Sequence, residues 1–163
     1  MKTICAGQYF SILVGADGTE FVRAGDEVLV VALSEQGQVL LIKEPSPAFD
    51  VPTYVLPGGC VEDGEEFSLT ANRELQEEVG FRASMLNHLG ELRPFSKYLA
   101  VRSHVYLARQ LAPSELPRDE DYEIEVSRIS LGDFETMIED GRLLDARVIA
   151  ALYLARAFIS RGA

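Results

Sequence analysis

The sequence is poor in cysteine and has no tryptophan. Its two cysteines, Cys5 and Cys60, lie far apart and belong to no CxxC pair or histidine cluster, so neither a disulfide framework nor a zinc site is supported. Long apolar runs are also absent. No segment approaches the ~20 apolar residues of a membrane span, and the run after Lys2 breaks at Gly7, too early for a signal peptide. We therefore expect a soluble cytoplasmic protein with reduced thiols and no membrane partner.

Positive charge is scarce as well. Lysine and arginine number 15 against 26 aspartates and glutamates, which gives a net charge of -11. This balance argues against nucleic acid or anionic membranes as partners, and a phosphorylated substrate would need metal ions or locally placed arginines. A chain of 163 residues that is 47% hydrophobic supports one core but not two. We expect a single domain over residues 1–163.

The strongest signal is a short segment in mid-chain, residues 59–81, which reads GCVEDGEEFSLTANRELQEEVGF. At ~100° per helical residue, four apolar side chains form one row that should face the core. These are Phe67, Ala71, Leu75 and Val79. Gly80 should end the helix, because glycine adopts the left-handed conformation at little cost.

Three glutamates share the same helix. Glu74, Glu77 and Glu78 lie three and four residues apart, a spacing at which like charges destabilise a helix by a few tenths of a kcal/mol. Glu78 also lies at the border of the apolar row, where an unsatisfied charge is costly. A divalent cation would replace this repulsion by shared coordination, and Mg²⁺ suits carboxylate oxygens. A metal site therefore explains the pattern better than a solvated acidic face.

The segment resembles the signature of the Nudix hydrolases, G-x5-E-x7-R-E-U-x-E-E-x-G-U, in which U is a bulky apolar residue. The defined positions are filled by Gly59, Glu65, Arg73, Glu74, Leu75, Glu77, Glu78, Gly80 and Phe81. Seven fixed letters match by chance at about 10⁻⁸ per starting position. The resemblance implies hydrolysis of a P-O-P bond in a nucleoside diphosphate linked to a further group, with Mg²⁺, or Mn²⁺, as cofactor.

The resemblance also implies roles for individual residues. Glu74, Glu77 and Glu78 would be metal ligands, and a backbone carbonyl at Gly58 or Gly59 would join them. Two further residues would pair with the ligating carboxylates and orient them. These are Arg73 and Glu65. In several members of the family the general base comes from a late loop, where Glu120, Asp121, Glu123 and Glu125 are all available here. Glu120 is favoured, because it lies inside the acidic loop.

Further matches, at residues 8–11 and 145–147 and at 71–75 within the helix, resemble the ADP-ribose pyrophosphatase and bacterial ADP compounds hydrolase branch. In that branch an aromatic residue of the N-terminal strands stacks on adenine, often across a homodimer interface. Tyr9 holds the matching position, with Arg23 as a possible cationic partner.

Ser96 and Tyr98, in the basic and aromatic connector 93–102, are further candidates for contacts with the substrate. ADP-ribose or a related ADP compound is the expected substrate. Three alternatives stay open. One is another Nudix substrate, such as a dinucleoside polyphosphate or a nucleotide sugar. The others are a catalytically silent nucleotide-binding module and a purely structural domain.

The remaining pattern predicts the architecture. Strand-like runs at 8–14 and 19–23, joined across an Asp-Gly turn, indicate a leading β-hairpin within residues 1–26. The runs 27–33 and 38–43 should pair with each other in a central sheet, followed by a strand at 53–56.

Strands are expected after the acidic helix at 85–92, 103–111 and 123–129. A capping box of Ser130 and Asp133 should open a helix that ends at Gly141, and Asp145 should cap a final helix. This order, together with the resemblance, predicts an α/β/α sandwich around a mixed sheet.

Overall fold

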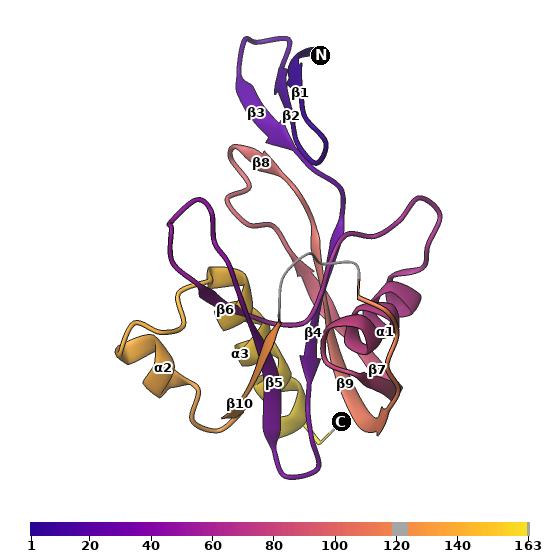
Figure 1. Cartoon of the computed structure of the whole chain (residues 1–163). Coiled ribbons are helices and arrows are strands. Elements are labelled where there is room, and N and C mark those ends of the chain that lie inside the picture. The colour runs from indigo at the N-terminus through magenta and orange to yellow at the C-terminus, as the bar shows by residue number, and fades with distance from the viewer. Residues whose placement is uncertain (119–123, 163) are drawn as a thin grey trace.

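The computed structural model describes residues 1–118 and 124–162. The N-terminal region contains three strands, β1 (Lys2–Ala6), β2 (Ser11–Val14) and β3 (Glu20–Arg23), paired antiparallel in that order. They project at one end of the molecule (Figure 1). The predicted hairpin is present as β2 and β3, and β1 adds a third strand that was not expected. Strand β1 was missed because all five of its residues are exposed, so it lacks the apolar alternation that marks a half-buried strand.

Three long strands form the sheet that carries the site. Strand β4 (Glu27–Ala32) runs parallel to β9 (Ser103–Pro113), and β7 (Phe81–Leu92) runs antiparallel to β9. The expected pairing of β4 with the next strand is wrong. Strand β5 (Gln38–Glu44) instead pairs with β10 (Glu125–Ser130) and β6 (Thr53–Val55), and it meets β4 through a bridge beside their turn. Parallel pairing of β4 depends on a strand more than 70 residues away, which no local pattern reveals.

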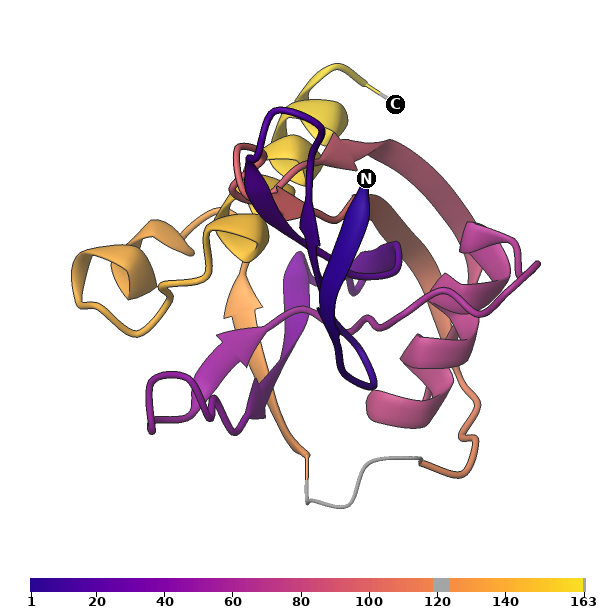
Figure 2. The same cartoon turned by 90° about the horizontal axis from the view of Figure 1, so that it is seen from above.

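Two helices cover the β4–β9–β7 sheet. Both α1 (Phe67–Glu78) and α3 (Ala146–Ser160) contact all three strands, and they are seen from above in Figure 2. All residues of β4 after its first are buried, as expected for a strand covered on both faces. This is the α/β/α arrangement that the sequence predicted. In the described ranges, no helix combines the length and apolar character that crossing a membrane requires.

The two C-terminal helices differ in how they begin. Helix α2 (Glu135–Glu139) has no side-chain cap, so the predicted capping box is wrong. The hydroxyl of Ser130 accepts from the amide of Gly132 instead, closing a local turn. Helix α3 is capped as predicted, because the Asp145 carboxylate accepts from the amides of Arg147 and Val148. The Asp145 cap sets the position of Arg147 beside the site described below.

Candidate active site

Helix α1 presents its acidic residues from a buried position. Ala71 and Leu75 are fully buried and Val79 is 8% exposed, so the predicted apolar row does face the core. Gly80 follows with φ of 72°, the left-handed conformation expected at the helix end. Two of the glutamates are almost inaccessible, since 6% of Glu74 and 2% of Glu78 is exposed. Carboxylates this deeply buried require partners.

The glycine loop before the helix is wedged between β4 and α1. A Cβ atom on Gly58 would lie 2.1 Å from the carbonyl oxygen of Val28, and one on Gly59 would lie 2.4 Å from Oε1 of Glu74. Neither glycine is among the residues with positive φ, so both are needed for close approach and not for an unusual backbone angle. The loop is fixed to β4, because the amide of Val28 donates to the Gly59 carbonyl at 2.9 Å. The position of this loop against Glu74 is therefore determined by packing.

Hydrogen bonds hold the glutamates in place. The amide of Gly58 donates to Oε2 of Glu78 at 2.8 Å. Nη1 of Arg73 lies 2.9 Å from Oε1 of Glu74 and 2.9 Å from Oε2 of Glu77. Arg73 also donates through Nε to Glu65 at 3.2 Å. One guanidinium thus links three carboxylates of the signature segment.

These contacts shift the ionisation of both ends of the network. Burial lowers the pKa of Arg73, but hydrogen bonds and charges from Glu65, Glu74 and Glu77 outweigh burial and raise its pKa well above the ordinary value. Burial raises the pKa of Glu65, and hydrogen bonds from Arg73 and Thr70 outweigh it, so the pKa of this carboxyl lies below its ordinary value. Arg73 is cationic and Glu65 anionic at neutral pH.

The donor set fits a hard divalent cation. Glu74 and Glu78 supply carboxylate oxygens next to the glycine loop, and Glu77 shares the Arg73 guanidinium with Glu74. Such oxygens are the ligands that Mg²⁺ prefers. In the present arrangement Arg73 supplies the positive charge between Glu74 and Glu77. Within residues 1–118 and 124–162, no three acidic, histidine or cysteine side chains converge as a ready-made metal cage.

A second charged network was missed by the sequence analysis. Glu27, at the start of β4, accepts from Nη1 of Arg147 at 2.7 and 2.9 Å and from the hydroxyl of Ser103 at 2.5 Å. Arg147 is held from its other side by Asp145 at 2.8 Å. Glu27 also forms a β-bridge with Cys60 in the glycine loop. Arg147 and Glu27 are 120 residues apart, so their pairing left no signal in local spacing.

This network lines a cavity of about 430 Å³ between the N-terminal strands and the glycine loop. We call it the Tyr9 cavity. Its lining includes Tyr9, Phe10, Glu27, Cys60 and Arg147. Tyr9 is 66% exposed, so its ring is available to a ligand. The structure thus brings the predicted aromatic residue to a cavity that adjoins the signature segment.

The other predicted substrate residues are dispersed around this region. Arg23 and Ser96 line a second cavity of about 430 Å³. Tyr98 lies 5.1 Å from Phe95, ring centroid to centroid, and beneath the ammonium group of Lys97. Their connector also contains β8 (Leu99–Ala100), which pairs parallel with β3.

The candidates for the general base fall into two groups. Glu120, Asp121 and Glu123 lie outside the described residues. Glu125 begins β10 and pairs with Lys43 at 3.5 Å. Its side chain is therefore placed on the sheet that carries β5.

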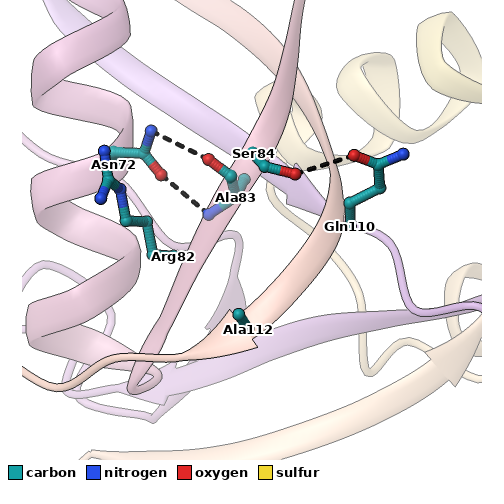
Figure 3. A pocket seen from close by; sticks show the side chains of 6 residues that line it. All are labelled: Asn72, Arg82, Ala83, Ser84, Gln110 and Ala112. Atoms are coloured by element: carbon teal, nitrogen blue, oxygen red, sulfur yellow. Dashed lines mark hydrogen bonds between the residues drawn. The ribbon is translucent and has the colours of Figure 1, made fainter.

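A cavity of about 540 Å³ lies on the other side of α1 (Figure 3). There the Asn72 side chain donates to the Ala83 carbonyl at 3.2 Å and accepts from its amide at 2.9 Å. At ~100° per residue, Asn72 points away from the three glutamates. This contact clamps α1 to β7 and belongs to the scaffold, although the space beside it is larger than the Tyr9 cavity.

Comparison with known proteins adds to this geometry. The NUDIX domain family model matches residues 24–152. The ADP-ribose pyrophosphatase of Bacillus subtilis (strain 168) is 30% identical over 139 residues, which are 84% of this chain and 75% of that protein. The ADP compounds hydrolase NudE of Escherichia coli (strain K12) is 29% identical over 134 residues, 82% of this chain and 72% of that protein. A crystal structure of an ADP compounds hydrolase matches with a TM-score of 0.83 at 26% identity, covering 99% of this chain and 92% of that one.

Proposed function

The chain belongs to the Nudix family and is a pyrophosphohydrolase, and from this premise we propose that it hydrolyses ADP-ribose or a related ADP compound. The products would be AMP and a phosphorylated second half, such as ribose 5-phosphate. The observation that carries the proposal is the pair of buried carboxylates, Glu74 and Glu78, held against a glycine loop inside a complete Nudix signature. The activities named for the similar proteins support the choice of ADP compounds.

The proposed cofactor is Mg²⁺, with Mn²⁺ as an alternative. Glu74, Glu77 and Glu78 would hold it together with one backbone carbonyl. The Gly59 carbonyl already accepts the amide of Val28, so we assign this role to Gly58. When bound, the metal supplies charge neutralisation for the diphosphate oxygens and lowers the pKa of a water molecule.

The protein residues orient the reacting groups. Arg73 restrains Glu74 and Glu77 through one guanidinium nitrogen, which limits the positions available to both carboxylates. Glu65 fixes the opposite edge of that guanidinium. Tyr9 would stack on adenine within its cavity, leaving the diphosphate to extend toward Cys60 and the glycine loop. Glu120 remains the proposed general base.

We extend the proposal to the assembly and location of the protein. Residues 1–163 would act as one domain, because the buried apolar residues of the described chain, apart from Leu13 and Val101, form one cluster. A homodimer through the N-terminal strands would cover β1, which lies at the edge of its sheet with all its residues exposed. Sedimentation at several protein concentrations measures the oligomeric state directly.

Cys5 and Cys60 are both free thiols, in keeping with a reducing cytoplasm.

The decisive experiment measures AMP release from ADP-ribose with Mg²⁺ or Mn²⁺, in the wild type and in Glu78→Gln. The amide oxygen of glutamine still accepts from Gly58, so the variant should remain folded. Loss of the carboxylate should lower kcat by about 100-fold or more. Glu62→Gln, which removes an exposed charge from the same segment, is the matched control.

Two outcomes would reject the assignment. Full activity of Glu78→Gln would remove Glu78 from the reaction. Wild-type protein that binds ADP-ribose without cleaving any ADP compound would identify a silent nucleotide-binding module. Stabilisation against thermal unfolding by Mg²⁺ or Mn²⁺ alone, by mass action, tests metal binding separately from turnover.

A further inference from the structure

Three arginines surround one cavity in a chain that carries a net charge of -11. This cavity, the arginine pocket, has a volume of about 430 Å³. Its lining includes Arg23, Arg93, Arg102 and Asp26. The chain has 15 basic residues against 26 acidic ones, so this grouping reverses the local sign of the charge.

The arginines are only partly neutralised by neighbouring carboxylates. Arg102 donates to Asp26 at 3.0 and 2.7 Å, and Arg93 donates to Glu91 at 2.6 Å. Arg23 contacts the sulfur of Met1 at 3.4 Å, and among the described residues no carboxylate forms an ion pair with it. Three guanidinium groups thus face two carboxylates, which leaves an excess of positive charge. Each guanidinium has five N–H donors, most of which these contacts leave unused.

The arginine pocket adjoins the Tyr9 cavity. The two share Ala24, Leu99 and Val101 in their linings, so a ligand in one lies beside the other. Tyr9 and Phe10 supply aromatic surface on the first side, and Arg23 supplies charge on the second. An aromatic cavity that shares a wall with a cationic pocket matches a nucleoside that carries an extra phosphate.

We propose that the arginine pocket binds a phosphate monoester on the adenosine ribose, so that the preferred substrates are ADP compounds phosphorylated at the 2′ or 3′ hydroxyl. With adenine stacked on Tyr9, the ribose lies between base and diphosphate, and a phosphate on it would extend into the neighbouring pocket. Arginine suits this role, because its planar fork of donors matches phosphate oxygens, and arginine likewise accommodates the 2′-phosphate of NADP in other folds. This inference rests on the proposed function, since it deepens the same site.

A binding experiment tests the pocket without requiring catalysis. Titration calorimetry would compare 5′-AMP with adenosine 2′,5′-bisphosphate and adenosine 3′,5′-bisphosphate. We expect the wild type to bind one bisphosphate about tenfold or more tightly than 5′-AMP, which is the gain expected of a charge-assisted hydrogen bond. Arg23→Gln should abolish most of this difference, with a much smaller loss of affinity for 5′-AMP. Arg23 is the best position to change, because its loss orphans no carboxylate.

The control is Arg82→Gln. Arg82 is an exposed arginine of β7 that lines the cavity behind α1, so the variant makes the same change in net charge away from the arginine pocket. It should bind all three nucleotides like the wild type. Circular dichroism confirms that both variants are folded. Arg93→Gln provides a second variant within the pocket, with the same expected selective loss.

Several results would overturn the inference. Equal affinities for 5′-AMP and both bisphosphates would show that the pocket does not recognise the phosphate. An equal loss for all three nucleotides in Arg23→Gln would assign Arg23 to the common nucleoside. Inorganic phosphate could also bind the pocket and leave the extra affinity of the bisphosphate over 5′-AMP unchanged. That result would show that the pocket is a separate anion site. Failure to hydrolyse any ADP compound would reject the proposed function alone, because the binding comparison is read without turnover.

Discussion

The glycine loop provides the sharpest test of the site, because the same small change at two neighbouring positions should have different effects. In Gly59→Ala, the new Cβ would lie 2.4 Å from Oε1 of Glu74, closer than the 3.0 Å below which real Cβ contacts essentially do not occur. The carboxylate is the end of a flexible side chain, so it can move away. In Gly58→Ala, the Cβ would lie 2.1 Å from the carbonyl oxygen of Val28, which is fixed in the buried strand β4.

The structure gives the expected magnitudes. Moving Glu74 breaks its contact of 2.9 Å with Arg73, but Arg73 keeps Glu65 and Glu77 as partners. Overpacking of this kind costs about 1–2 kcal/mol, or roughly 2–8 °C in Tm for a chain of this size. Turnover should fall at least about tenfold, because a proposed metal ligand is displaced. Gly58→Ala should cost about 3 kcal/mol or more, roughly 6–12 °C in Tm.

Thermal unfolding followed by circular dichroism measures the change in Tm. The rate of AMP release from ADP-ribose, assayed well below Tm, measures turnover. Gly132→Ala is the control, because its Cβ would make an ordinary contact at 3.5 Å with the Ser130 hydroxyl. It should match the wild type in both assays. Full activity in Gly59→Ala, or a wild-type Tm in Gly58→Ala, would refute the reasoning about close approach.

Three further predictions concern the scaffold and the thiol. Asn72→Ala should cost about 2–3 kcal/mol, because it leaves both the amide and the carbonyl of Ala83 without their partner; urea unfolding measures this, and an unchanged midpoint contradicts it. Burial acts to raise the pKa of Asp145, but Arg147 and two backbone amides outweigh it and hold the pKa below its ordinary value of 3.8. The stabilisation from Asp145 is therefore present above pH ~4 and lost as the pH falls through the lower folded-state pKa. Asp145→Asn lacks this carboxylate, so lowering the pH should reduce its urea midpoint less than it reduces that of the wild type. Burial, followed by the charges of Glu27 and Glu74, raises the pKa of Cys60 above its ordinary value of 9.0. In a Cys5→Ser background, alkylation of Cys60 should therefore reach half its maximal rate above pH 9.0. Glu27→Gln should lower the pH of that midpoint.

Local patterns predicted the elements whose signals are local. The apolar row through Ala71 and Leu75, the helix end at Gly80 and the cap at Asp145 all appear as expected. Each depends on residues within one or two turns of each other, where the backbone geometry fixes which side chains share a face. The capping box at Ser130 failed for a related reason, because the same hydroxyl can instead close a turn onto Gly132.

The sequence by itself determined the family signature and the acidic helix, because these depend on local spacing, and the order of its elements together with the family resemblance predicted the layered fold. Only the tertiary structure decided the partner of β4, the pairing of Glu27 with Arg147 and the meeting of Arg23 with Arg102 around one pocket. Such contacts join residues tens to more than a hundred positions apart. They are selected by burial and charge complementarity summed over the whole chain, and no short stretch of sequence carries that sum.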